Sequence, residues 1–253
     1  MKKLLVALAL ASSLFAAEAI KVGASPVPHA QILEVVAPEL LKEGFTLEIV
    51  EFTDYVMPNK ALDEGALDAN FFQHVPYLEE FNKANGTKIV NAAGVHVEPM
   101  GIYSKKLKKP SEIKEGGLIY IPNDPTNESR ALDLLAVSGL ITLKDVKIKT
   151  INDIEKNDKK LDIKTIEAPQ LPRVVDEADL AVINTNFAID AGLSPKKDAI
   201  ALEGGESVYV NIIAVKEGQE DSAKTKALIK AVKSEAVKKF IDSKYEGSVL
   251  SVF

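Results

Sequence analysis

The amino-acid sequence predicts an α/β protein made of two lobes, each a mainly parallel sheet flanked by helices. Segments that alternate like strands and segments with helical spacing of apolar residues follow one another along the chain. This strand–helix order is typical of parallel sheets with helices on both faces. The order runs twice, and no low-complexity linker separates the runs, which favours lobes joined by strands over lobes joined by a flexible tether.

The first run of the pattern begins at residue 20. Ile32, Val35, Val36 and Leu40 have the spacing of one helix face, and Gly44 ends the helix that they predict. The expected elements are a strand over 20–24, a helix over 28–41, a strand over 45–52, a helix over 57–64, a strand over 67–72, a helix over 76–85 and an extended segment over 88–103.

The second run begins at residue 117. Its expected elements are a strand over 117–121, a helix over 125–138, an extended segment over 146–151, a surface helix or loop over 152–160, a strand over 162–167, a short helix over 171–177, a strand over 178–183, a helix over 185–191, a strand over 207–215 and one long helix over 225–245. The extended segments near 100–105 and 201–208 are the best candidates for strands that cross between lobes. We therefore expect one lobe from 20–103 and 206–253, and the other from 104–205.

The N-terminus has the pattern of a secretory signal peptide over residues 1–19. Two lysines precede an apolar run over 4–15, and Ala17, Glu18 and Ala19 form an A-x-A cleavage site. The chain contains no cysteine, which argues against a lipid anchor, disulfides and cysteine-ligated metals. No later apolar run is long enough for a membrane helix. We therefore expect an exported, soluble protein of the periplasm.

Charge and motifs exclude several classes of function. The net charge of −6, without basic runs, argues against nucleic acid as a partner. Phosphate-binding, dinucleotide-binding, nucleophile-elbow and zinc-protease motifs are missing from the sequence. We therefore expect neither an enzyme nor a bound cofactor.

Two similar strand ends predict a cleft. Residues 63–72 and 176–183 each lead from an acidic helix end into a short apolar strand. Gln73 and His74 follow the first strand, and Asn184 and Thr185 follow the second. Ligands of open α/β sheets bind at the carboxyl ends of strands, so two such ends facing each other would enclose one.

Residues 118–135 have the pattern of a strand, a polar turn and a helix start. Asp124 suits the cap of this helix and Pro125 its first position. Asn127 and Arg130 are three residues apart and share a helix face. Free backbone N–H groups and a guanidinium at one place can hold a carboxylate. The alternative is a capped surface helix whose arginine is solvated.

Histidines, aromatic residues and one asparagine are further candidates. His29, His74 and His96 are candidates for a metal site, although they have no regular ligand spacing, and the alternative is hydrogen-bonded or pocket-lining histidines. Asn211 lies inside an apolar strand and needs partners if it is buried, whether in a ligand site or in a neighbouring loop. Phe71 and Phe72 alternate sides on their strand, so one can face the cleft, unless both belong to the core.

Several motifs occur in an order that resembles the NlpA-type, MetQ-like methionine-binding proteins of ABC importers. Asp-Ala-Asn-Phe-Phe-Gln-His-Val-Pro-Tyr stands at 68–77, and Ile-Pro-Asn-Asp-Pro-Thr-Asn stands at 121–127 ahead of Arg130. The remaining motifs lie at 103–106, 167–173, 181–185, 192–195 and 209–211. The resemblance covers nearly the whole chain after residue 19.

The resemblance implies a type II periplasmic-binding-protein fold whose two lobes close on one amino acid, most simply methionine. The partners that it implies are the membrane permease of an ABC importer and its ATPase, and we expect the binding protein itself to be a monomer. It assigns the ligand carboxylate to Arg130 with Asn127 nearby, and the backbone end of the ligand to Asn184 and Asn211, with Asn211 as the partner of the amino group. Tyr55, Phe72 and His74 would line the side-chain pocket, where aromatic walls suit a thioether.

The chain departs from this family pattern in two places. Family members are typically lipoproteins, which need a cysteine. They also commonly have aromatic residues where this chain has His96 and Glu98. If His96 and Glu98 face the cleft, the pocket is more polar, and another amino acid or a methionine-containing dipeptide becomes an alternative ligand. A metal-binding transport protein using His29, His74 and His96 is the alternative from another class of function.

Overall fold

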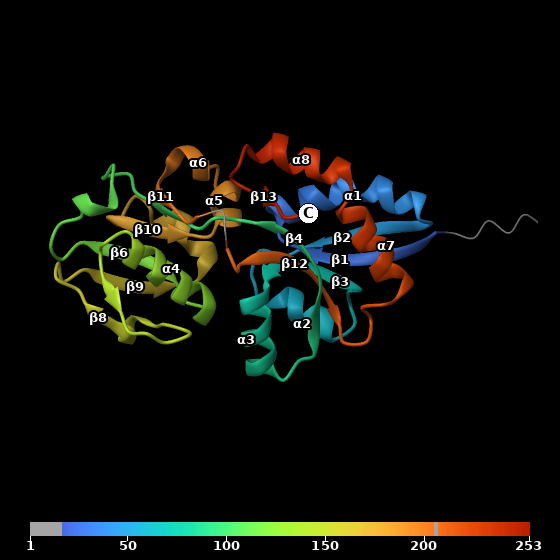
Figure 1. Ribbon diagram of the computed structural model, residues 1–253, viewed down its shortest axis with the longest axis horizontal. Coiled ribbons are helices and arrows are strands. Elements are labelled where there is room, and N and C mark those ends of the chain that lie inside the picture. The colour runs from blue at the N-terminus through green and yellow to red at the C-terminus, as the bar shows by residue number, and fades with distance from the viewer. Residues whose placement is uncertain (1–16, 205–206) are drawn as a thin grey trace, which may run out of the picture.

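The computed structural model describes residues 17–204 and 207–253, and it has two lobes that lie side by side along its long axis (Figure 1). Each lobe is built on its own sheet with helices packed against it. Most of the expected signal peptide, residues 1–16, lies outside the described residues.

The first lobe contains a sheet in the order β13-β4-β12-β3-β1-β2. Its strands are β1 (Glu18–Ala24), β2 (Phe45–Glu51), β3 (Ala69–His74), β4 (Ile89–Val97), β12 (Val210–Lys216) and β13 (Leu250–Ser251). β1 runs parallel to β2 and β3, whereas β12 runs antiparallel to β3 and β4. Its helices are α1 (Gln31–Lys42), α2 (Met57–Asp63), α3 (Val75–Asn85), α7 (Ala223–Val232) and α8 (Glu235–Tyr245).

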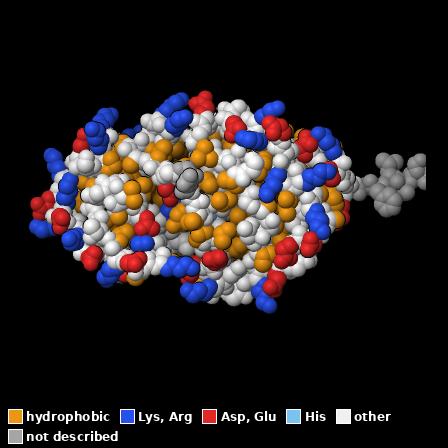
Figure 2. All heavy atoms as spheres, in the orientation of Figure 1, with side chains coloured by type: hydrophobic (Ala, Val, Ile, Leu, Met, Phe, Trp, Pro, Cys, Tyr) orange, Lys and Arg blue, Asp and Glu red, His pale blue; other side chains and the backbone are white. Residues whose placement is uncertain are grey.

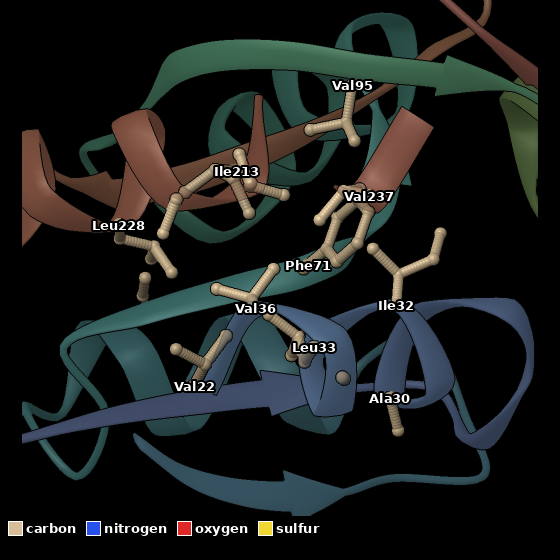
Figure 3. Close-up of a cluster of buried hydrophobic side chains, with 14 of the residues drawn as sticks. Val22, Ala30, Ile32, Leu33, Val36, Phe71, Val95, Ile213, Leu228 and Val237 are labelled. Atoms are coloured by element: carbon tan, nitrogen blue, oxygen red, sulfur yellow. The ribbon is translucent and has the colours of Figure 1, made fainter. Parts of the chain in front are cut away.

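The side chains of β12 alternate between two hydrophobic clusters, as a strand buried on both faces requires. Ile213 packs in the cluster that includes α1, α7 and α8, and Ile212 packs in the cluster that includes α2 and α3. In the first cluster, the ring of Phe71 from β3 lies between helix residues such as Val36 and Val237 (Figure 3). Helices on both faces therefore hold the strand ends of this lobe in place.

The second lobe contains a smaller sheet in the order β11-β5-β10-β6-β9. Its strands are β5 (Gly101–Tyr103), β6 (Leu118–Pro122), β9 (Asp162–Ile166), β10 (Leu180–Ile183) and β11 (Ala199–Leu202), and a hairpin is formed by β7 (Thr142–Leu143) and β8 (Ile154–Lys156). Its helices are α4 (Pro125–Val137), α5 (Thr185–Asp190) and α6 (Pro195–Asp198). The second lobe also has short helical turns at η2 (Pro110–Glu112), η3 (Ile151–Asp153) and η4 (Ala168–Val174), and a further short turn, η1 (Pro26–Ala30), lies between β1 and α1 of the first lobe.

The two-lobed α/β class is confirmed, and the antiparallel strands come from the segments that pass between lobes. After β4 the chain crosses into β5, and after β11 it returns into β12. β5 is the first strand after the chain enters the second lobe, and β12 is the first strand after it returns to the first lobe. Both strands run antiparallel to their neighbours. The lobe boundaries stay a prediction, and β5 pairs in the second sheet although it precedes the expected boundary at residue 104.

One expected element was wrong. The single helix over 225–245 is two helices, because Ser234 has an extended backbone and its hydroxyl accepts the N–H of Val237 at 3.4 Å, which starts a second helix, α8. The segment over 146–151, expected to be extended, pairs in no sheet, and at its end Thr150 makes a capping box with Asp153 around η3.

None of the helices in the described part of the chain combines the length and the apolar character that crossing a membrane requires. On the face drawn in Figure 2, lysine and arginine side chains are interspersed with aspartate and glutamate.

Candidate ligand-binding site

A cavity lies where strand–helix junctions of the two lobes meet. The junctions are β3–α3 in the first lobe, and β6–α4 and β10–α5 in the second. Between the lining atoms there is about 350 Å³ of space that no atom occupies, and this volume includes space open to solvent. It is lined by Tyr55, Phe72, Gln73, His74, Tyr77, Glu98, Asn127, Arg130, Asn184, Thr185, Asn186 and Asn211. The expected cleft between carboxyl ends of strands is therefore present as a pocket where the two lobes meet.

Arg130 is buried and fixed on the inner side of α4. Asp124 caps this helix, because its carboxylate accepts the backbone N–H of Asn127 at 3.0 Å, and burial raises the pKa of Asp124. The guanidinium donates from Nε to Glu203 at 2.9 Å and from Nη2 to the backbone oxygen of Glu98 at 2.7 Å. The ring of Tyr209 lies 4.3 Å from the guanidinium carbon. The solvated-arginine alternative is therefore excluded.

The amide side chains form a polar wall beside Arg130. Asn184 donates from Nδ2 to Oδ1 of Asn127 at 2.9 Å, and the buried Oδ1 of Asn184 has no hydrogen-bond partner among the described residues. Oδ1 of Asn211 lies 3.0 Å from Nε2 of His29. Asn184 thus leaves an acceptor at the cavity, and a buried acceptor without a partner is costly unless a ligand satisfies it.

Aromatic rings form another part of the cavity wall. The ring centroids of Tyr55 and Phe72 are 6.0 Å apart, and those of Tyr55 and Phe187 are 5.0 Å apart. The Tyr55 hydroxyl donates to Oδ1 of Asn186 at 2.6 Å, which joins the two lobes across the cavity. Phe72 lines the cavity, whereas Phe71 belongs to the core, so one of the adjacent phenylalanines faces each way.

His74 caps α3 and reaches across to the other lobe. Its Nδ1 accepts the backbone N–H of Tyr77 at 3.2 Å, and its Nε2 lies 3.2 Å from Oδ1 of Asn127. Burial, together with the charge of Arg130, lowers the pKa of His74 to about 3. The neutral ring with its proton on Nε2 satisfies both contacts, because Nδ1 accepts and Nε2 donates.

His29 and His96 converge on Glu98 behind the cavity wall. Nε2 of His96 is 2.7 Å and Nε2 of His29 is 3.2 Å from the same carboxylate oxygen. Burial lowers the pKa of His29 to about 4 and that of His96 to about 3, and it raises the pKa of Glu98. Among the described residues, this trio is a possible metal-ligand group, but His74 is not part of it. The alternative metal site of three histidines is therefore not formed.

Every expected site residue except His96 lines the cavity. His96 is fully buried behind Glu98, because its strand position turns the ring into the first lobe. Gln73 and Thr185, which were expected at the cleft as strand ends, also line the cavity, whereas Tyr77 and Asn186 in the lining and Glu203 as the partner of Arg130 were not predicted from the sequence. For Asn186 a signal was available, since it follows Asn184 at the start of the same helix. The roles of these residues in ligand binding stay predictions.

Comparison with known proteins agrees with the motif order. The family model described as NlpA lipoprotein matches residues 20–253. The methionine-binding lipoprotein MetQ of Bacillus subtilis is 46% identical over 92% of this chain and 88% of its own length. The D-methionine-binding lipoprotein MetQ of Escherichia coli K12 is 43% identical over 91% of this chain and 87% of its own length.

A solved structure has the same fold with a ligand. The nutrient-binding protein from Burkholderia cenocepacia bound to methionine has a TM-score of 0.91 and 46% identity, and the match covers 92% of this chain and 100% of that chain. The matched family consists of substrate-binding transport proteins and not of enzymes. The prediction that this protein is not an enzyme is therefore confirmed.

The expected location was wrong. The relatives from Bacillus subtilis and Escherichia coli are both named lipoproteins, which contradicts a freely soluble protein of the periplasm. The expectation rested on the lack of cysteine in the sequence. The lack of cysteine was therefore not enough to predict the location of the protein.

Proposed function

This chain belongs to the NlpA lipoprotein family, and from that membership we propose that it binds methionine between its lobes and delivers it to an ABC importer. The single observation that carries the proposal is the cavity between the lobes that is lined by both Arg130 and aromatic rings. A guanidinium can hold the ligand carboxylate, and aromatic rings suit the thioether.

Arg130 is assigned the ligand carboxylate because its orientation is already fixed. Glu203 and the backbone oxygen of Glu98 occupy Nε and Nη2, while Nη1 makes no hydrogen bond to the described residues. Asn127 lies one helix turn earlier on the same side. We assign the backbone end of the ligand to Asn184 and Asn211, and its side chain to Tyr55, Phe72 and His74.

Titration calorimetry of the ligand-stripped protein with L-methionine and D-methionine tests the proposal. We expect saturable binding of at least one isomer at one site, with micromolar affinity or tighter. Native mass spectrometry of the protein as purified identifies a retained ligand independently. Failure of both isomers to bind, together with a retained ligand of different chemistry, would overturn methionine as the ligand.

Delivery to the importer is tested with membranes. The permease and ATPase of the importer would be reconstituted in vesicles with this protein, and ATP-dependent uptake of labelled methionine would be measured. We expect uptake to require both the protein and ATP. Uptake that is equal without the protein would contradict its role in delivery.

A further inference from the structure

Glu98 places a carboxylate in the cavity wall, and no lysine or arginine among the described residues forms an ion pair with it. The side chain is buried, and Glu98 lines the cavity directly after β4. Arg130 contacts only its backbone oxygen, and the side-chain charge of Arg130 is paired with Glu203. No other lysine or arginine lines the cavity among the described residues. A buried charge without a counterion is unfavourable, so this carboxylate is suited to a cation that arrives with the ligand.

Two imidazoles hold this carboxylate in position. His96 comes from the end of β4 and His29 from η1, and both direct Nε2 at one oxygen of Glu98. His29 and His96 are themselves almost completely buried, at 1% and 0% exposure. Neutral His96 in the tautomer with its proton on Nε2 donates that proton to Glu98, which supports the ionised form of Glu98 without supplying a positive charge. The Nε2 proton of neutral His29 serves Oδ1 of Asn211 at 3.0 Å, and the His29 ring borders the same oxygen of Glu98. His29 and His96 thus act as positioning residues.

A second acceptor, on Asn184, lines the cavity together with Glu98. The buried Oδ1 of Asn184 has no partner among the described residues. Oδ1 of Asn211 is already engaged with His29. A primary ammonium has three N–H groups, and carboxylate and amide oxygens around it satisfy them.

We propose that Glu98 is a specificity-determining residue that binds the ammonium group of the ligand, and that it restricts the cavity to ligands with a free primary ammonium. This inference rests on the proposed function, since it concerns the same cavity. It shifts the amino-group contact from Asn211, which the family resemblance suggests, to the side chain of Glu98.

The test compares each amino acid with its desamino analogue by calorimetry. For methionine the analogue is 4-(methylthio)butanoic acid, which keeps the carboxylate and thioether but lacks the ammonium. We expect the unaltered protein to prefer methionine by about 100-fold, since a charge-assisted contact is lost. This comparison needs no variant, and equal affinity for the two ligands would overturn the inference.

Glu98→Gln assigns the effect to the carboxylate. We expect it to weaken methionine binding by about 10- to 100-fold and to leave binding of the desamino analogue unchanged. Glu128→Gln is the matched control, because Glu128 is a buried carboxylate that accepts the N–H of Ile151 at 2.9 Å and lies outside the cavity lining. Equal loss for both ligands in Glu98→Gln would overturn the inference and leave the proposed function standing.

A failure of the proposed function can be distinguished from a failure of this inference. If methionine does not bind but another amino acid does, the same comparison with the desamino analogue of that amino acid decides the role of Glu98. If no amino acid binds the unaltered protein, the proposed function and this inference are both overturned.

Discussion

At the scale of single residues, the site requires the planar guanidinium of Arg130 and not only its positive charge. Its planar fork donates to Glu203 and stacks on Tyr209, which a lysine cannot reproduce. We expect Arg130→Lys to weaken methionine binding by about 10- to 100-fold, and Arg130→Ala to abolish it, in titration calorimetry. Arg173→Lys is the control, because Arg173 is exposed. Binding by Arg130→Lys within the error of the unaltered protein would contradict the carboxylate assignment.

The low pKa of His74 makes the free energy of unfolding depend on pH. The pKa of His74 is about 3 in the folded protein, against an ordinary 6.5, so between these values the unfolded chain binds a proton that the folded chain does not. The stabilisation is present above pH 6.5 and is lost as the pH falls. We expect His74→Asn, which can still cap α3, to flatten this loss by up to ~1.4 kcal/mol per pH unit.

The measurement is urea unfolding of the ligand-free protein at several pH values. His29 and His96 titrate together with Glu98, whose raised pKa acts in the opposite direction. His74 has no bond to that group, so its contribution can be separated. A slope unchanged in His74→Asn would show that His74 does not carry the loss.

At the scale of elements, the start of α4 joins helix stability to the site. Asp124 accepts both the backbone N–H and the side-chain Nδ2 of Asn127, at 3.0 and 2.9 Å. We expect Asp124→Ala to lower the free energy of unfolding by about 1 kcal/mol and to weaken methionine binding, because Asn127 loses its anchor. Chemical denaturation and calorimetry measure the two effects.

Ser222→Ala provides the matched control for this helix cap. Ser222 caps α7 by accepting the N–H of Thr225 at 3.1 Å, and it lies outside the cavity lining. A similar loss of stability with unchanged affinity is expected, since an N-cap costs about 1 kcal/mol wherever it is removed. An equal change of affinity in both variants would refute the link between the cap and the site.

Elements with local signals were the predictable ones. Asp124 with Pro125 marks the start of α4, and the positive φ of Gly86 matches the end of α3. The partners of Arg130 were not predictable, because Glu203 lies 73 residues away and reaches it only through the pairing of β11 beside β5. The burial of His96 likewise depends on β12 pairing with β4, which is a contact between distant segments.

At the scale of the whole molecule, the two lobes touch across the cavity through side chains. Tyr55 of the first lobe donates to Asn186 of the second at 2.6 Å, and His74 lies 3.2 Å from Asn127. The chain passes between the lobes twice, so the lobes can rotate about paired connections without losing their cores. These contacts belong to a closed arrangement, and a ligand that bridges the same wall would favour it.

Tyr55→Phe tests whether these contacts contribute to closure. The change removes one hydrogen bond between lobes and keeps the ring, while Tyr77 still donates to the backbone oxygen of Tyr55. We expect roughly 2- to 10-fold weaker methionine binding, and a larger radius of gyration in small-angle X-ray scattering without ligand. Saturating methionine should bring the variant and the unaltered protein to the same radius. Tyr103→Phe is the control, because the buried Tyr103 hydroxyl has no partner among the described residues and its removal breaks no contact. Identical scattering and affinity in Tyr55→Phe would mean that closure does not depend on this bond.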